Sequence, residues 1–144
     1  MPQTNQAGRK LIESFEGCVL TPYLDAVGVP TIGYGHTLNV SMTMHPITQA
    51  QADGLLDADL HIFEEGVNGL VNRSLTPNQF ASLVSFAYNL GLGSLQSSTL
   101  LRLVNEGDLS GAAPHFMSWT YAGGQQLEGL VRRRQAEMDL FNTK

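Results

Sequence analysis

The spacing of apolar residues is helical along most of this chain, and it changes character between Val19 and Thr37. There the sequence contains VLTPYLD and PTIGYGHT, two short β-prone pieces that are punctuated by glycines. Short pieces of this kind, separated by turn residues, predict a β-hairpin, whereas apolar residues that recur three and four positions apart predict helices. We therefore expect a mostly helical α+β fold with a small hairpin.

Six helical segments are expected around the hairpin, each placed by its cap and stop signals. The segment that begins Thr76-Pro77-Asn78-Gln79 has a capping box with proline at the first helical position, and it runs to Gly91. Because it is apolar on more than one side, we interpret it as a central helix. The other segments cover 5–16, capped by Thr4 or Asn5 and stopped by Gly17; 48–71, capped by Thr48; 98–106, closed by Gly107; 109–118, opened by Asp108; and 127–141, after the Gly123-Gly124 turn.

The order of these elements predicts two lobes within one domain. The chain has 144 residues, which suits one domain, and we expect 1–144 to form it. The first helix and the hairpin would form a small N-terminal lobe, which the long helix 48–71 would link to a helical C-terminal lobe. We expect a ligand to bind in the cleft between the lobes.

Charge is distributed unevenly along the chain. The formal net charge is -5, and the interval 11–72 contains eight acidic residues and no Lys or Arg. From Arg73 onward six basic residues face five acidic ones, so no broad cationic surface for nucleic acid emerges. No stretch reaches the length of a membrane span, and the first ten residues lack the apolar core of a secretion signal. We therefore expect no nucleic-acid partner, no membrane insertion, and a chain that starts in the cytosol.

Cysteine and histidine usage predicts no metal and no cofactor. Cys18 is the one cysteine, so it cannot form an internal disulfide, and the four histidines lack metal-ligand spacing such as HExxH. We interpret Cys18 as a small buried residue because no histidine-partnered thiolate context is evident.

Two carboxylates stand on neighbouring elements of the predicted N-terminal lobe. Glu16 ends the first helix and Asp25 lies in the hairpin, so the two side chains can face one another. A glycosidase needs such a pair, because one protonated acid must donate to the leaving oxygen while an ionised group acts on a water or on the sugar carbon. Thirteen acidic residues also guarantee some near neighbours, so two solvated surface carboxylates remain an alternative.

The context of these carboxylates is more specific. Phe15-Glu16-Gly17, Tyr23-Leu24-Asp25 and the segment PTIGYGHT at 30–37 place Glu, Asp and Thr31 with eight and then five residues between them. This pattern resembles the catalytic signature of the phage-type (T4-like) lysozymes, the bacteriophage endolysins of glycoside hydrolase family 24. The segments SFAYNLG at 85–91 and GGQQLEGLVRRR at 123–134 are similar to that family's central-helix and C-terminal segments. The resemblance covers roughly residues 5–142.

The resemblance implies a lysozyme-like catalytic domain that hydrolyses the β-1,4 bonds between N-acetylmuramic acid and N-acetylglucosamine in peptidoglycan and so lyses the host. Glu16 would be the general acid, kept protonated by desolvation and by the charge of Asp25. Asp25 and the Thr31 hydroxyl would hold the attacking water, which implies inversion of configuration. Two alternatives stay open: a lytic transglycosylase, which needs the acid but no held water, and a wall-binding protein without catalysis.

Substrate contacts are also implied by the resemblance. Tyr88 and Asn89 would offer a stacking face and a hydrogen-bonding amide to the cleft, and Gly33 and Gly35 would let the hairpin backbone approach the sugar. Each position has a structural alternative. Tyr88 could pack in the core, Asn89 could make a cap-like hydrogen bond near Gly91, and the glycines could serve their turn.

Other residues near these motifs are expected to have structural roles. The resemblance suggests that His36 makes an ion pair or hydrogen bond, Trp119 is expected in the core, and Arg132, Arg133 and Arg134 are expected to make ordinary surface ion pairs. We expect a monomer that acts on peptidoglycan glycan strands. It would stay in the host cytoplasm until a holin-type pore gives it access to the wall. A secreted antibacterial effector would share this chemistry.

Overall fold

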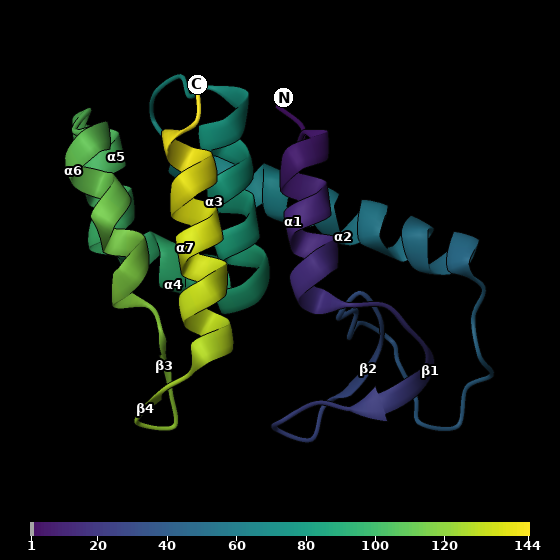
Figure 1. The fold of residues 1–144 in the computed structure, drawn as a ribbon. Coiled ribbons are helices and arrows are strands. Elements are labelled where there is room, and N and C mark those ends of the chain that lie inside the picture. The colour runs from purple at the N-terminus through teal and green to yellow at the C-terminus, as the bar shows by residue number, and fades with distance from the viewer. Residues whose placement is uncertain (1) are drawn as a thin grey trace. The chain divides into compact units, whose positions relative to one another are not determined.

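The computed structural model describes residues 2–144 and confirms a mostly helical α+β fold (Figure 1). Helices predominate, and two short antiparallel strand pairs accompany them. The helices are α1 (Gln6–Glu16), α2 (Gln49–Leu70), α3 (Pro77–Leu90), α4 (Leu92–Ser97), α5 (Thr99–Glu106), α6 (Leu109–Ala112), the 3-10 helix η1 (Ala113–Ser118) and α7 (Glu128–Asn142). The strands are β1 (Val19–Leu24), β2 (Pro30–Gly33), β3 (Tyr121–Ala122) and β4 (Gln125–Gln126).

The chain divides into two compact units. The hairpin unit is Glu13–Ile62, and the helical unit combines Met1–Ile12 with Phe63–Lys144. Helix α2 begins in the hairpin unit and ends in the helical unit, as predicted for a linking helix. A single catalytic domain over 1–144, with a cleft between its lobes, stays a prediction.

The hairpin unit is built on the antiparallel pair β1 and β2, in which Tyr23 lies opposite Thr31. The chain enters this pair from α1 through Gly17, whose φ of +68° and N–H bond to the Glu13 carbonyl end the helix as predicted. After β2 the chain reverses within a few residues, because Ile32 and His36 exchange two backbone hydrogen bonds of 2.9 Å each.

Gly33 and Gly35 lie inside this reversal. Their φ angles are +68° and +79°, in the region that glycine tolerates best. The predicted turn role of both glycines is therefore confirmed. Their contact with a sugar stays a prediction.

The helical unit is organised around α3. Every residue from Phe80 to Ala87 is buried, so this helix is enclosed by its neighbours, as expected of a central helix. The Phe86 ring meets the rings of Phe116 and Trp119 edge to face, with centroids 6.0 and 5.5 Å apart. Helix α7 packs alongside α3 (Figure 1). Trp119 is half-buried and contributes to this core, as expected.

Candidate active site

Glu16 is the last residue of α1, and its side chain is half-buried. It lies in the hairpin unit together with Asp25 and Thr31, so one compact unit holds the three predicted catalytic residues. The helix stop at Gly17 turns the chain directly into β1, which explains why a helix-end acid and a hairpin acid belong to the same local structure.

Asp25 is fixed by the turn that it starts. Its Oδ1 accepts hydrogen bonds of 2.9 Å from the backbone N–H groups of both Val27 and Val29. Its own N–H donates to the Val29 carbonyl at 3.0 Å. Its Oδ2 accepts no hydrogen bond from residues 2–144. One carboxylate oxygen therefore holds the turn, and the other is available to a ligand.

Thr31 is tied to the same turn. Its side chain is 3% exposed, and its hydroxyl donates to the Val29 carbonyl at 2.9 Å. The Val29 carbonyl thus accepts from both Asp25 and Thr31 and couples their positions. Because the hydroxyl proton is engaged, the Thr31 oxygen can act toward a water molecule only as an acceptor.

Tyr23 brings the two carboxylates into one electrostatic neighbourhood. Burial raises the pKa of the Tyr23 phenol above its usual value, and the negative charges of Glu16 and then Asp25 raise it further. Glu16 and Asp25 therefore belong to the same electrostatic surroundings of this phenol. The sequence analysis did not single out Tyr23 as a site residue. The alternation of side chains along a strand could have indicated Tyr23. Residues two positions apart, such as Tyr23 and Asp25, are expected on the same face.

Further polar contacts brace the hairpin unit. His36 lies 2.8 Å from Asp59 through Nδ1 and 2.8 Å from the Leu38 carbonyl through Nε2, which confirms its expected structural role. Gln49 donates to the Tyr34 hydroxyl at 3.0 Å. Cys18 is half-buried instead of buried, and its Sγ lies 3.8 Å from Gln49 Oε1.

Tyr88 and Asn89, the predicted substrate contacts, lie in the helical unit. Tyr88 is half-buried and its ring packs against Phe63, with centroids 5.3 Å apart. Asn89 Oδ1 accepts a 2.8 Å hydrogen bond from Arg134 Nη2, so the alternative of a cap-like bond is wrong. The cap of α3 is Gly91, whose N–H donates to the Ala87 carbonyl.

Known proteins match this chain over the residues of the site. The model of the Phage lysozyme family matches residues 13–137, a range that includes Glu16, Asp25 and Thr31. The chain belongs to the phage lysozyme family. It is 46% identical to an endolysin of Bacillus phage PZA over 98% of its length, which is 55% of that protein. It thus spans about half the length of that curated relative.

Two further similarities extend this result. The chain is 40% identical to a SAR-endolysin of Bacteriophage PS119, with 89% of this chain and 77% of that protein covered. The muramidase domain of SpmX from Asticaccaulis excentricus superimposes with a TM-score of 0.92 at 40% identity, and both chains are covered fully at 100%. The lysozyme-like fold is therefore confirmed.

In this member of the phage lysozyme family, the three consecutive arginines of α7 depart from expectation. Arg132 makes the expected surface ion pair, at 2.9 Å to Glu128. Arg133 and Arg134 are 4% and 0% exposed, so a surface role for them was wrong. Both approach Glu137, which is 0% exposed; burial raises the pKa of its carboxyl, and the two guanidinium charges oppose that shift. The buried acid explains why two arginines face inward, since a buried charge needs a partner.

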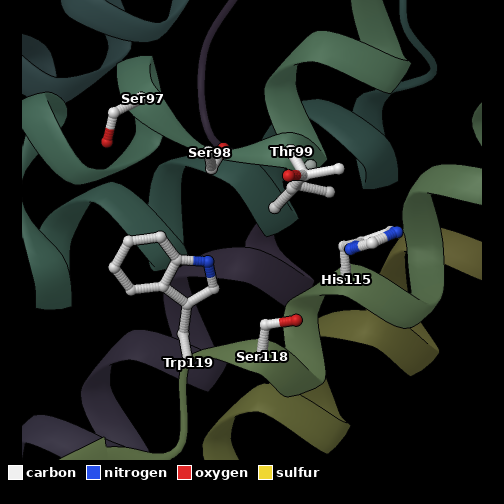
Figure 2. Close-up of a pocket in the computed structure, with 7 residues that line it drawn as sticks. Ser97, Ser98, Thr99, His115, Ser118 and Trp119 are labelled. Atoms are coloured by element: carbon white, nitrogen blue, oxygen red, sulfur yellow. The ribbon is translucent and has the colours of Figure 1, made fainter.

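The helical unit of this phage lysozyme family member also contains a pocket of about 270 Å³ (Figure 2). Figure 2 shows the Trp119 indole and the His115 ring at this pocket, together with the hydroxyls of its rim. The pocket is lined by Ser97, Ser98, Thr99, Leu100, His115, Ser118 and Trp119. It holds no carboxylate, so it cannot supply the acid that glycoside cleavage needs.

The described residues form neither a metal centre nor a membrane-spanning helix. Among residues 2–144, no three His, Cys, Asp or Glu side chains gather closely enough to hold a metal ion. Within residues 2–144, no helix is both long enough and apolar enough to cross a membrane.

Proposed function

We propose that this chain is a muramidase-type endolysin, a lysozyme that hydrolyses the β-1,4 bonds between N-acetylmuramic acid and N-acetylglucosamine and so lyses the host cell. The observation that carries the proposal is the grouping around Tyr23. Glu16 and Asp25 both act on its phenol, and Thr31 lies opposite it in the hairpin. Membership of the phage lysozyme family supports the same activity.

The proposed roles follow from the hydrogen bonds. Glu16, half-buried at a helix end, donates its proton to the glycosidic oxygen as the bond to the anomeric carbon breaks. Asp25 Oδ2, the oxygen that the turn does not use, accepts a proton from the attacking water. Thr31 accepts the other hydrogen of that water, because its own proton is given to Val29. A water held opposite the leaving group gives inversion of configuration.

The decisive experiment compares the wild type with Glu16→Gln on purified peptidoglycan, followed by mass spectrometry of the released muropeptides. Reducing-end products from the wild type that disappear in Glu16→Gln are the expected result. Glu13→Gln is the matched control, because it removes a carboxylate one turn earlier on the same helix. Anhydro products would indicate a lytic transglycosylase, and no products from either protein would indicate a wall-binding module.

The stereochemistry has its own test. Nuclear magnetic resonance of the first product should show the α-anomer if a water attacks the β-linked sugar directly. The β-anomer as the first product would exclude direct attack by water and would indicate a double displacement instead.

We also propose that the protein acts as a monomer, has no cofactor, and stays in the host cytoplasm until a holin-type pore gives it access to the wall. The endolysin relatives support this role in lysis. Expression in a bacterial host, with and without a separate pore-forming protein, tests the route. Lysis only with the pore is expected, and equal lysis without it would contradict this part of the proposal.

A further inference from the structure

One residue, Val29, connects the two side chains that are proposed to hold the attacking water. Its N–H donates to Asp25 Oδ1 at 2.9 Å. Its carbonyl oxygen accepts from the Asp25 N–H at 3.0 Å and from the Thr31 hydroxyl at 2.9 Å. A carbonyl oxygen has two lone pairs, so both are in use. The direction of this carbonyl therefore sets where Asp25 lies and which way the Thr31 hydroxyl points.

The direction of the Thr31 hydroxyl decides how Thr31 can act on a water molecule. While its proton is given to Val29, its oxygen can only accept a hydrogen bond from the water. A hydroxyl turned toward the water would donate to the water oxygen instead, and would engage the lone pair that must attack the anomeric carbon. The productive state of Thr31 is therefore the one in which Val29 binds its proton.

Pro30 stands between this carbonyl and Thr31 in the chain. A proline ring fixes its own φ near about −65°, and it restricts the residue before it to extended conformations. The ring therefore restricts the torsion on each side of the Val29–Pro30 peptide bond, and with them the direction of the Val29 carbonyl. A residue other than proline at position 30 would leave both torsions freer.

The hairpin accommodates a proline at this position without losing a hydrogen bond. Pro30 lies opposite Leu24 in the pair of β1 and β2, one step from the place where the Asp25 N–H bonds to Val29. Hydrogen-bonded and non-hydrogen-bonded pairs alternate along an antiparallel ladder, so the nitrogen of residue 30 points away from β1. The proline thus adds rigidity beside Thr31 and removes nothing from the ladder.

We propose that Pro30 is a positioning residue for hydrolysis. It holds the Val29 carbonyl in the direction that keeps the Thr31 proton bound, so that Thr31 and Asp25 together accept the two hydrogens of the attacking water. A misplacement of about 1 Å at a reacting centre can cost about 100-fold in rate, so a residue that restricts these torsions acts on kcat. This inference rests on the proposed function, because it assigns Pro30 to the water-holding groups of that reaction.

The test compares Pro30→Ala and Pro30→Gly with the wild type in steady-state hydrolysis of soluble peptidoglycan fragments. Alanine removes the restriction of the ring, and glycine widens the allowed φ further. We expect kcat to fall about two- to fivefold in Pro30→Ala and more in Pro30→Gly, with KM little changed. Pro46→Ala is the matched control, because it removes a proline from an exposed loop of the same unit and should leave kcat unchanged.

A double-mutant cycle tests whether Pro30 acts through the Thr31 hydroxyl. Thr31→Val removes the hydroxyl, so no side-chain proton is left for the Val29 carbonyl to bind. Pro30→Ala should then cause little further loss of kcat in the Thr31→Val background, although it lowers kcat in the wild type. A merely structural role of the proline would give the same loss in both backgrounds. Circular dichroism and the melting temperature establish that each variant is folded.

Two results would overturn the inference. A folded Pro30→Gly variant with the kcat of the wild type would show that hydrolysis does not depend on the restriction by the ring. Equal losses from Pro30→Ala in both backgrounds would show that Pro30 does not act through the Thr31 hydroxyl. Neither result touches the proposed function, which fails only if the wild type releases no reducing ends from peptidoglycan.

Discussion

At the residue scale, Asp25 uses its two carboxylate oxygens differently. Oδ1 accepts hydrogen bonds from two backbone N–H groups of the turn, and Oδ2 is the oxygen proposed to act on the attacking water. A residue with both functions cannot be tested by alanine alone, because the loss of the turn and the loss of the charge would coincide. Asparagine separates them, since its amide oxygen can accept the same two hydrogen bonds without a negative charge.

We therefore predict different outcomes for two substitutions of Asp25. Asp25→Asn should melt near the wild-type temperature and lose hydrolytic activity by at least about 100-fold, in the range found for general acid–base groups. Asp25→Ala should lose activity similarly and also about 0.5–1.5 kcal/mol of stability, because two exposed N–H groups of the turn exchange their carboxylate acceptor for water. Thermal melts and product release measure the two effects. High activity in Asp25→Asn would show that the charge is not needed.

Tyr23 reports on both carboxylates through its pKa. The pKa of its phenol is raised from 10.0 by burial, by Glu16 and by Asp25, in decreasing order. We predict that Glu16→Gln and Asp25→Asn each lower this pKa, and that Glu16→Gln lowers it more. Ultraviolet titration of the phenols, with Tyr23→Phe subtracted to isolate Tyr23, measures the shift. An unchanged pKa in both variants would mean that the carboxylates lie away from the phenol.

The same shift predicts a pH dependence of stability. The folded chain keeps the Tyr23 proton at pH values where the unfolded chain has lost it. The folded state therefore binds more protons above about pH 10, and stability falls as the pH rises through the raised pKa. Tyr23→Phe should lack this part of the alkaline loss in denaturant melts. An identical slope in both proteins would contradict the prediction.

At the element scale, the sequence predicted those elements whose ends carry capping chemistry. Asn5 caps α1 through a 2.9 Å bond to the Gly8 N–H, Asp108 caps α6, and Gly107 closes α5 in a left-handed conformation. Side chains that bond their own backbone act within a few residues, so a sequence window contains the whole interaction. The boundaries of α1, α3 and α5 were therefore predicted closely.

The elements that were missed lack such local signals. Helix α4 is only six residues long and begins directly after Gly91, which the sequence indicated as a stop. The segment 109–118 was predicted as one helix but continues as a 3-10 helix after Ala112, with Pro114 inside it. Strands β3 and β4 have two residues each around the predicted Gly123-Gly124 turn. Elements this short are held mainly by their neighbours.

The site shows the same division between local and long-range information. Glu16, Asp25 and Thr31 stand in one contiguous stretch, so their spacing could carry the prediction. The contact from Arg134 to Asn89 joins residues 45 positions apart, so no short sequence window contains it. A run of charged residues such as Arg132 to Arg134 predicts a solvated surface unless the buried partner is known. The buried partner, Glu137, becomes recognisable only once α3 and α7 are packed together.

The cap of α3 gives a prediction about stability. Thr76 Oγ1 accepts from the Gln79 N–H at 3.1 Å, and Gln79 Oε1 accepts from the Thr76 N–H at 2.9 Å. Thr76→Ala should cost about 1 kcal/mol, and should lower the melting temperature by about 2–4 °C for a chain of this size. Thr76→Ser keeps the hydroxyl and should melt near the wild type. Equal losses in both variants would show that the hydroxyl does not act as a cap.

At the scale of the whole molecule, the net charge of -5 is carried by one part of the chain. The hairpin unit has six acidic residues and no Lys or Arg, whereas the helical unit has seven acidic and eight basic residues. The unit that holds Glu16 and Asp25 is thus the more negative one. An anionic bacterial wall would repel it, in contrast to the attraction that a cationic enzyme would experience.

We therefore predict that moderate salt raises the activity on intact walls or leaves it unchanged. At 0.1 M ionic strength the Debye length is about 10 Å, so repulsion between exposed charges on the protein and the wall is largely screened. Asp57→Lys, at an exposed position of the hairpin unit, should reduce the salt effect, and short neutral glycan substrates should show none. Lysis rates between low and moderate salt measure the effect. A steep fall in activity over that range would show that attraction, and not repulsion, governs the encounter with the wall. The acidic hairpin unit would then have to face away from the wall as the protein approaches.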